Sequence, residues 1–184
     1  MNEIIKKNWK PKKNLVIDET LMRFKGKFKF RQHIKSKPHD TGVKYYILSD
    51  SSQYIYDVWI YRGYQPGMTF LVLDFLSRIP SKNHQLILDS YYGSSTLAYI
   101  LSKIGFGFVF VCQKNRIEKD IREKFKENQL DIYDCQSVKD RDYINVCFKD
   151  KSRCIYFCQN IFDTVGEFQK NVEKPEIVKF YNRN

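Results

Sequence analysis

The chain has 184 residues, a formal net charge of +11, 42% hydrophobic residues and 16% aromatic residues. This length suits one domain with a hydrophobic core and is too short for two of ordinary size, and the composition excludes a disordered chain. No apolar run approaches the ~20 residues of a membrane span, and the N-terminal MNEIIKKNWKPKKN lacks the apolar core of a secretion signal. We therefore expect an intracellular globular protein.

The positive charge is concentrated at the start of the chain. Residues 1–44 contain thirteen Lys or Arg against four Asp or Glu, whereas residues 45–184 contain nineteen against seventeen. This concentration favours a polyanionic partner, with nucleic acid as the first candidate and an anionic membrane as the second. A lysine-rich composition that serves only solubility is the alternative.

The first predicted strand is LVIDETL, residues 15–21, which contains an Asp-Glu pair. It runs into RFKGKFKFR, residues 23–31, where cations occupy every second position and Phe or Gly lie between them. In a strand this alternation places every cation on one face and the aromatic side chains on the other. We expect this cationic face to follow nucleic-acid phosphates, the alternative being a solvated edge strand in which Lys blocks edge-to-edge pairing.

The middle of the chain alternates strands and helices. Residues 43–50 and 54–63 predict a hairpin that turns at residues 51–53, and 69–79 predicts an amphipathic helix capped by Thr69. Then follow, in order, a strand at 85–89, a helix at 94–105 with a serine N-cap and Gly105 as its stop, and an apolar strand at 106–113.

The last third is more charged. Residues 117–129 predict a helix with one narrow apolar face, 143–160 predict two strands that turn at 149–152, and 176–181 predict a short strand. The five cysteines include no C-x-x-C pair, so we expect buried thiols and no zinc site. The order of elements predicts an α/β fold of ribonuclease-H-like type, a mixed sheet flanked by helices with a C-terminal β-rich extension or insertion.

Asp89 ends the buried strand QLILD and needs a partner, because an unpaired buried charge is costly. A cation, a basic side chain or a metal ion would each serve. The plain alternative for Asp89 is an N-cap of the 94–105 helix, and for Asp18 a capping role or a pairing with a nearby lysine.

Two sequence blocks resemble the catalytic domain of piggyBac-type transposases. The first, 17–63, contains Asp18-Glu19, then Phe24-Lys25-Gly26-Lys27, then a run from Lys37-Pro38 through Gly42 to Lys44. The second, 86–116, is similar to an Asp-Asn-aromatic-aromatic-Thr-Ser segment with its following helix and strand, although Ser90 replaces the Asn and Val111-Cys112 replaces a Gly-Thr pair. A weaker third block comprises FKDKSRCIYF and KPEIVKFYN.

The resemblance implies a transposase that cuts and joins DNA at transposon ends. It also implies that Asp18 and Asp89 are catalytic ligands of Mg²⁺ or Mn²⁺, ions that hard carboxylate oxygens suit. Two such ions can activate the attacking oxygen of the reaction and stabilise the leaving oxygen. The resemblance further implies a third Asp a few residues beyond Tyr181-Asn182, whereas no Asp follows Asp163. We therefore expect residues 1–14 to be a basic extension and 15–184 one domain truncated before the third acid: a fragment, a decayed copy or a recruited remnant that is incomplete or inactive.

The resemblance implies DNA as the partner and the nucleus as the location. A homodimer is possible, and no membrane partner is expected. The expected DNA-binding residues are Arg23, Lys25, Lys27, Lys29, Arg31, Lys35, Lys37, Lys44, Lys114 and Arg116. Three other functions stay open: a DNA-binding remnant without catalysis, a nuclease on RNA–DNA hybrids, and a basic interaction module without nucleic-acid chemistry.

Overall fold

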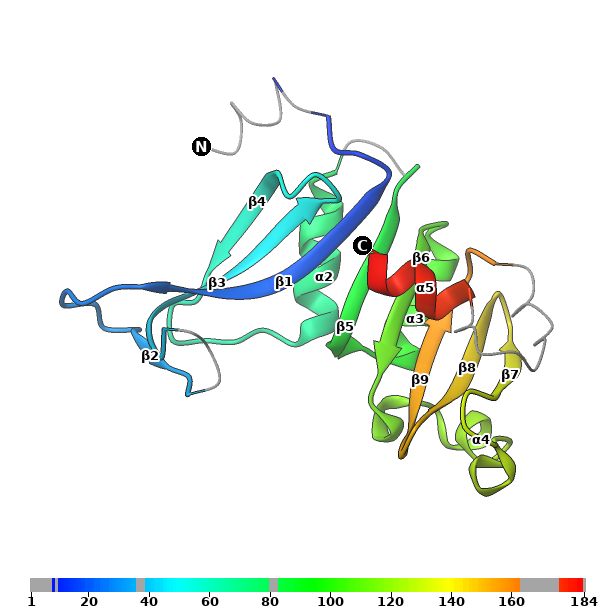
Figure 1. Ribbon diagram of the computed structural model, residues 1–184. Helices are drawn as coiled ribbons and strands as arrows, with labels where there is room; N and C mark the ends of the chain where they lie inside the picture. Colours follow the sequence, from blue (N-terminus) through cyan, green and yellow to red (C-terminus); the bar gives the residue numbers. More distant parts are fainter. Residues whose placement is uncertain (1–7, 9, 36–38, 80–82, 163–175, 184) are drawn as a thin grey trace. The chain divides into compact units, whose positions relative to one another are not determined.

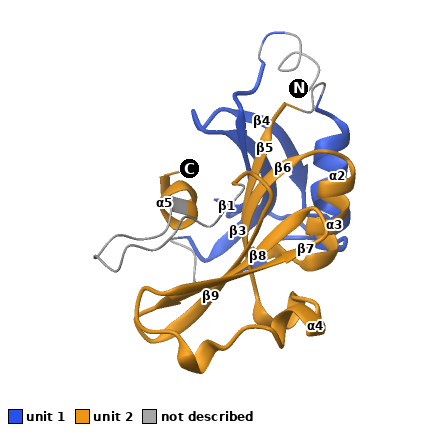
Figure 2. Ribbon diagram, turned by 90° about the vertical axis from the view of Figure 1, so that its right-hand side faces the viewer, with its two compact units in different colours: residues 1–80 blue, residues 81–184 orange. Residues whose placement is uncertain are grey.

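A computed structural model of the chain describes residues 8, 10–35, 39–79, 83–162 and 176–183. The chain divides into two compact units, residues 1–80 and residues 81–184, which are coloured separately in Figure 2. The two units are described in turn. No helix within the described ranges is long and apolar enough to cross a membrane.

Unit 1 is an antiparallel sheet built around one central strand. Its strands are β1 (Asn14–Arg23), β2 (Gln32–His33), β3 (Thr41–Asp50) and β4 (Ile55–Ile60). β3 pairs with each of the other three. The predicted first strand and the predicted hairpin are therefore confirmed, and the hairpin turn contains Gln53 at a positive φ of 64°.

The helix of unit 1 is α2 (Met68–Ser77), which lies against one face of the sheet in Figures 1 and 2. It buries Leu71, Val72, Phe75 and Leu76, the apolar side that the sequence predicts. The predicted cap at Thr69 is wrong, because the helix starts one residue earlier and its N-cap is Gly67, without a side-chain hydrogen bond.

The predicted strand over 23–31 is also wrong, because β1 ends at Arg23 and the described residues 24–31 form a loop. The centroids of the Phe24 and Phe28 rings are 6.4 Å apart, whereas four residues of strand would separate them by about 13 Å. Phe28 and Phe30 also pack edge to face, at 5.7 Å. Clustering of these aromatic rings on one another replaces the alternation that a strand would impose.

Unit 2 is a mixed sheet in the order β5-β6-β9-β8-β7. The strands are β5 (Gln85–Gly93), β6 (Gly107–Cys112), β7 (Cys135–Asp140), β8 (Tyr143–Asp150) and β9 (Arg153–Gln159). β5 and β6 are parallel and joined through α3 (Ser95–Lys103), whereas the other pairs are antiparallel. Ser94 caps α3 by accepting a hydrogen bond from the Leu97 amide, and Gly105 follows the helix at a φ of 76°, both as predicted.

Helices cover both faces of the unit 2 sheet. α3 lies on one face and α5 (Glu176–Arg183) on the other, as the two views of Figures 1 and 2 agree. Ile177 and Val178 of α5 are buried against Val109 of β6 and Phe157 of β9. The predicted strand at 176–181 is therefore wrong: adjacent residues of a strand face opposite sides, and here two adjacent residues enter the same core.

The charged segment after β6 is less helical than predicted. It contains a 3₁₀ turn (Lys114–Arg116), one turn of helix α4 (Lys119–Arg122) and a second 3₁₀ turn (Glu127–Gln129). Ile117, Ile121 and Phe125 are nevertheless all buried, as their spacing predicts. The C-terminal β-rich part is confirmed and is larger than expected, because β7 pairs with β8 through a two-residue turn. The mixed α/β fold class predicted from the sequence is thus confirmed.

Candidate active site and nucleic-acid interface

Asp18 is an exposed residue within a buried part of β1. Its neighbour Ile17 is 1% exposed, and Leu21 is 8% exposed. In the β1–β3 register Asp18 lies opposite Ile47. The Oδ1 atom accepts a hydrogen bond of 2.7 Å from the main-chain amide of Glu19, which fixes one carboxylate oxygen at the surface of the strand.

Asp89 lies where β5 departs from its partner strand. The parallel pairing of β5 with β6 continues to Leu88, which lies opposite Phe110, and resumes only at Gly93, opposite Cys112. Between these two pairs the chain advances five residues in β5 and two residues in β6. Asp89 is the first residue of this bulge and is exposed, and its Oδ1 accepts a 2.8 Å hydrogen bond from the Tyr91 amide. Such irregularities re-aim side chains and are frequent beside active sites.

The half-buried Arg116 holds the main chain of this bulge. Its Nη1 donates hydrogen bonds to the carbonyl oxygens of Tyr91 and, at 3.4 Å, Ser90. The sequence predicts Arg116 as a DNA contact. The structure gives its guanidinium an internal role beside Asp89, and a contact with DNA stays a prediction.

A cationic hollow lies on unit 1, and we call it the basic hollow. It has a volume of about 620 Å³. The basic hollow is lined by Arg23, Phe24, Lys25, Arg31, Lys35, His39, Asp40 and Thr41. The Thr41 hydroxyl donates a hydrogen bond of 3.1 Å to the Asp40 carboxylate. The Nδ1 atom of His33 lies 3.9 Å from Oδ2 of the same carboxylate. Within the described residues no carboxylate forms an ion pair with Arg23, Lys25, Arg31 or Lys35, so the cations face a hollow of net positive charge.

The loop that carries these cations is braced from within. Arg31 donates to the Gly26 carbonyl at 3.4 Å, and the Arg31 amide donates to the Phe28 carbonyl at 3.2 Å. Gly63, at a φ of 85°, lies directly under the Phe30 ring, where a Cβ would meet the ring carbons. The predicted strand is absent, but most of its cations still gather on one surface.

The other predicted DNA contacts are placed differently. Lys27 and Lys29 are exposed, and Lys29 Nζ lies 5.6 Å from the Phe30 ring centroid. Lys44 is only 8% exposed, with its Nζ 4.8 Å from the Tyr46 ring centroid, so it does not extend the exposed surface. Lys114 pairs with Glu127 at 2.7 Å, and Lys37 lies outside the described residues.

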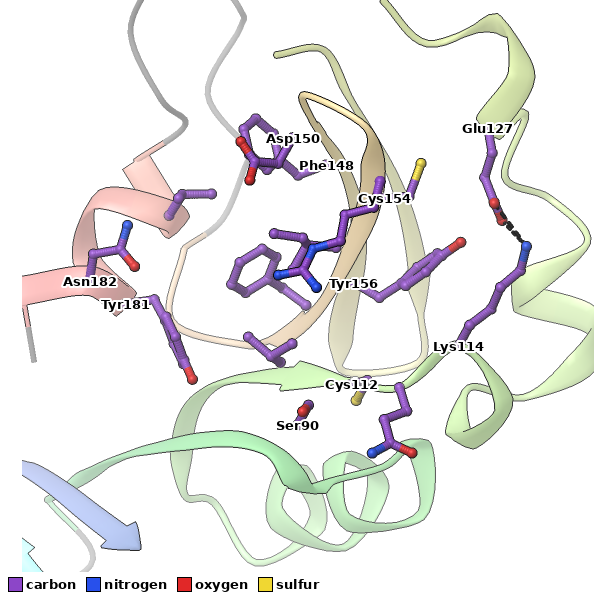
Figure 3. Close-up of a pocket in the computed structure, with 16 residues that line it drawn as sticks. Ser90, Cys112, Lys114, Glu127, Phe148, Asp150, Cys154, Tyr156, Tyr181 and Asn182 are labelled. Atoms are coloured by element: carbon purple, nitrogen blue, oxygen red, sulfur yellow. Dashed lines mark hydrogen bonds and ion pairs between the residues drawn. The ribbon is translucent and has the colours of Figure 1, made fainter. Parts of the chain in front are cut away.

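Unit 2 contains a pocket of about 690 Å³ that sequence reasoning missed, and we call it the unit 2 pocket (Figure 3). It is lined by Ser90, Val111, Cys112, Gln113, Lys114, Glu127, Phe148, Asp150, Arg153, Cys154, Ile155, Tyr156, Phe157, Val178, Tyr181 and Asn182. Figure 3 shows Tyr181 and Asn182 on one side and Lys114 with Glu127 on the opposite side.

Two groups that line the unit 2 pocket, Glu127 and Tyr156, have shifted pKa values. Burial works to raise the pKa of Glu127, but the hydrogen bond from Lys114 and the nearby Tyr156 hydroxyl outweigh burial and hold the pKa below its ordinary value. Burial and the same carboxylate raise the pKa of Tyr156. At neutral pH, Glu127 is therefore ionised and Tyr156 carries its proton.

The whole chain, residues 1–184, matches the sequence model of the family described as transposase IS4. The chain belongs to this transposase family. Its fold is also that of a solved piggyBac transposase, a cryo-EM structure of a synaptic complex with hairpin DNA, at a TM-score of 0.83 and 22% sequence identity. The match covers 99% of this chain and 40% of the solved one, so this transposase chain spans about two-fifths of that protein's length. The predicted family resemblance is confirmed.

The two aspartates of this transposase chain suit a hard divalent ion. Both present a carboxylate at the surface of a strand, and in each an amide holds one oxygen. Asp18 belongs to unit 1 and Asp89 to unit 2. Across the part of the chain that the structure describes, no three His, Cys, Asp or Glu side chains gather into a metal-binding cluster.

Two features of the candidate site were hidden in the sequence. The sequence predicts Arg116 only as a DNA contact and does not reveal its hydrogen bonds to Ser90 and Tyr91, which lie 26 and 25 residues earlier in the chain. The unit 2 pocket needs α5, which the sequence predicts as a strand. A signal for α5 was present, because Ile177, Val178 and Tyr181 also fit one face of a helix.

Proposed function

We propose that this chain is the part of a transposase that supplies carboxylate ligands for metal-dependent cutting and joining of DNA and that grips the DNA backbone. One observation supports the catalytic part most. Asp18 and Asp89, from different strands, are both exposed beside buried neighbours, and each has Oδ1 fixed by a main-chain amide. A ligand oriented before the ion arrives costs less to order on binding.

Bound Mg²⁺ or Mn²⁺ would supply activation of the attacking oxygen and stabilisation of the leaving oxygen of a phosphodiester. Asp18 and Asp89 would hold the ions through carboxylate oxygens. The role of Arg116 would be to keep the bulge, and hence Asp89, in one orientation. Outer contacts of this kind tune metal affinity about 10- to 100-fold in other metal sites.

The basic hollow supports DNA as the partner. Four exposed cations without acidic partners within the described part of the chain would contact phosphates, which set affinity and register but carry no base sequence. With DNA as the substrate, we also propose a nuclear location for the protein. Pairing of two copies on DNA belongs to the same proposal.

The metal proposal is tested by isothermal titration of Mn²⁺ into the chain and its Asp18→Asn and Asp89→Asn variants. Asn keeps the shape of Asp and removes the charge, and Asp120→Asn, on the exposed surface of α4, is the matched control. We expect both site variants to bind Mn²⁺ at least about tenfold more weakly than the wild type. The control should keep the wild-type affinity. Equal Mn²⁺ affinity in all four proteins would remove the metal site from the proposal.

A second candidate function is DNA binding without cutting, which the basic hollow favours because phosphate contacts need no metal. Fluorescence anisotropy with a labelled duplex, across a series of salt concentrations, tests it. Replacing Lys25 by Ala should reduce the slope of log affinity against log salt by about 1, whereas Lys139→Ala, an exposed cation of β7 outside the hollow, should leave the slope nearly unchanged. An equal change in both variants would show that only net charge matters.

A further inference from the structure

The unit 2 pocket differs from the basic hollow in its charge balance. Lys114 is paired with Glu127, with 2.7 Å between Nζ and Oε1. The remaining charged residues of the lining are Arg153 and Asp150, which face each other across the turn between β8 and β9. Two cations and two acids leave no net charge, so this pocket is poorly suited to a free phosphate.

Part of the unit 2 pocket lining is apolar and belongs to the packed core. Val111 of β6, Ile155 and Phe157 of β9, and Val178 of α5 all contribute to one core cluster. The Tyr181 ring forms one side and is held edge-on against Phe157, with 5.7 Å between centroids and 75° between planes. An occupant with a flat apolar surface therefore meets a preformed surface.

The rim adds polar groups that suit the edge of a planar heterocycle. Gln113 and Asn182 are exposed amides, each with a donor and an acceptor. Arg153 is exposed, and no described residue forms a hydrogen bond or ion pair with its side chain. A planar guanidinium stacks on aromatic and heteroaromatic faces, which an ammonium does not.

From these features we propose that the unit 2 pocket receives one unstacked nucleobase of a DNA strand, with Tyr181 and Arg153 as stacking groups and Asn182 and Gln113 at the polar edge. The inference rests on the proposed DNA-binding function. Ser90 lines the pocket and directly follows Asp89. A base held here belongs to a nucleotide close to the bond that Asp89 would act on, so the pocket positions that strand.

The volume and lining agree with this occupant. Pockets for small molecules typically measure about 300–1,000 Å³ and combine an apolar surface with a few polar groups, and about 690 Å³ lies within that range. A base in a duplex is stacked and paired, so the unit 2 pocket discriminates in favour of single strands. Sequence preference would come from the amides, because every base has a face that stacks.

The test compares two labelled single strands, each about ten nucleotides long. One carries thymine at every position, and the other has the same backbone without bases. Anisotropy gives both affinities for the full chain and for its Arg153→Ala, Arg153→Lys and Asn182→Ala variants. Lys151→Ala, in the same turn as Arg153 but outside the pocket lining, is the charge-matched control, and thermal melting verifies that each variant folds.

We expect the wild-type chain to bind the thymine strand about tenfold more tightly than the baseless strand. The ratio should fall toward one in Arg153→Ala and Arg153→Lys, decrease in Asn182→Ala, and persist in Lys151→Ala. Equal binding of both strands by the wild-type chain overturns the base pocket and leaves backbone binding intact.

Failure to bind either strand overturns backbone binding instead. In that case a titration with thymidine, which carries the base without a phosphate, tests the unit 2 pocket alone through amide chemical shifts. Shifts at Arg153 and Asn182 that saturate support the inference, and unshifted signals overturn it. The same titration also shows whether the pocket accepts a free nucleoside as well as a strand.

Discussion

The side chain of Arg116 donates a hydrogen bond to the main-chain oxygen of Tyr91, 25 residues earlier in the chain. Tyr91 in turn donates its amide to Asp89, so a guanidinium, a main-chain turn and a carboxylate form one connected unit. The position of Asp89 therefore depends on a residue that belongs to a different segment of unit 2.

Replacing Arg116 by Ala should weaken Mn²⁺ binding at Asp89 about tenfold, because the turn that orients the carboxylate loses its support. Isothermal titration of the variant measures the loss. Lys124→Ala removes an exposed cation of the same sign and should have no such effect. An Arg116→Ala variant with unchanged Mn²⁺ affinity and an unchanged melting temperature would show that the turn orients Asp89 without help.

Breaking the ion pair between Asp57 and Arg78 should strongly destabilise unit 1. The Asp57 side chain is fully buried, 2.6 Å from Arg78 Nε, and also accepts the Val58 amide. Arg78→Ala leaves this charge buried without its cation and should lower the free energy of unfolding by about 3 kcal/mol, as measured by urea denaturation.

The second partner of Arg78 provides a control for this estimate. Asp74 is partly exposed and lies 2.8 Å from Arg78 Nη1, so Asp74→Asn should cost no more than about 1 kcal/mol. In the double variant Asp57→Asn with Arg78→Ala, the loss should be smaller than the sum of the single losses, because no charge is left alone. Strict additivity would argue against direct coupling.

Glu127 predicts a pH dependence of stability. Its pKa is lowered in the folded chain, so its contribution is present above the ordinary pKa of 4.5 and is lost as the pH falls through the folded-state value. Urea denaturation from acidic to neutral pH measures the free energy of unfolding of the wild type and of Glu127→Gln. The difference in favour of the wild type should increase as the pH rises and should become constant above the ordinary pKa. A constant difference at every pH would exclude titration of Glu127 as the cause.

Gly93 should not tolerate a side chain. It pairs with Cys112 where the β5–β6 ladder resumes, and a Cβ there would collide with the main-chain oxygen of Val111. Gly93→Ala should therefore destabilise unit 2 by about 1–3 kcal/mol in thermal or urea unfolding. Gly67→Ala is the matched control, since a Cβ at that position would meet no atom within 4 Å and the φ of −55° suits alanine.

Much of the strand and helix order follows from periodicity. Segments such as 43–50 and 94–105 carry both an apolar pattern and a turn or cap, and the structure confirms both. The loop at 24–31 was beyond such reasoning, because the packing of Phe30 on Gly63 links residues far apart in sequence. The six residues 176–181 fit either period, and only the core that receives them decides.

For the candidate site, the sequence indicates which residue types are involved but reveals few of the residues that they contact. Asp18 and Asp89 stand out because each interrupts an apolar strand. The burial of Lys44 over Tyr46 depends on pairing between strands, which the basic residues alone do not reveal. The unit 2 pocket requires β9, α5 and the segment after β6 to meet, so its lining is not readable as a motif.

The two-residue turns that join β7 to β8 and β8 to β9 have a kinetic consequence. Both hairpins pair residues that are near neighbours in sequence, whereas Cys112 and Cys158, with their sulfur atoms 3.3 Å apart, are separated by 46 residues. Closing a short loop loses less chain entropy than closing a long one, so the 135–159 meander should gain protection first in pulse-labelled hydrogen exchange. The pairing of β6 with β9 would then form after the meander, and the unit 2 pocket, which also needs α5, would be complete only later.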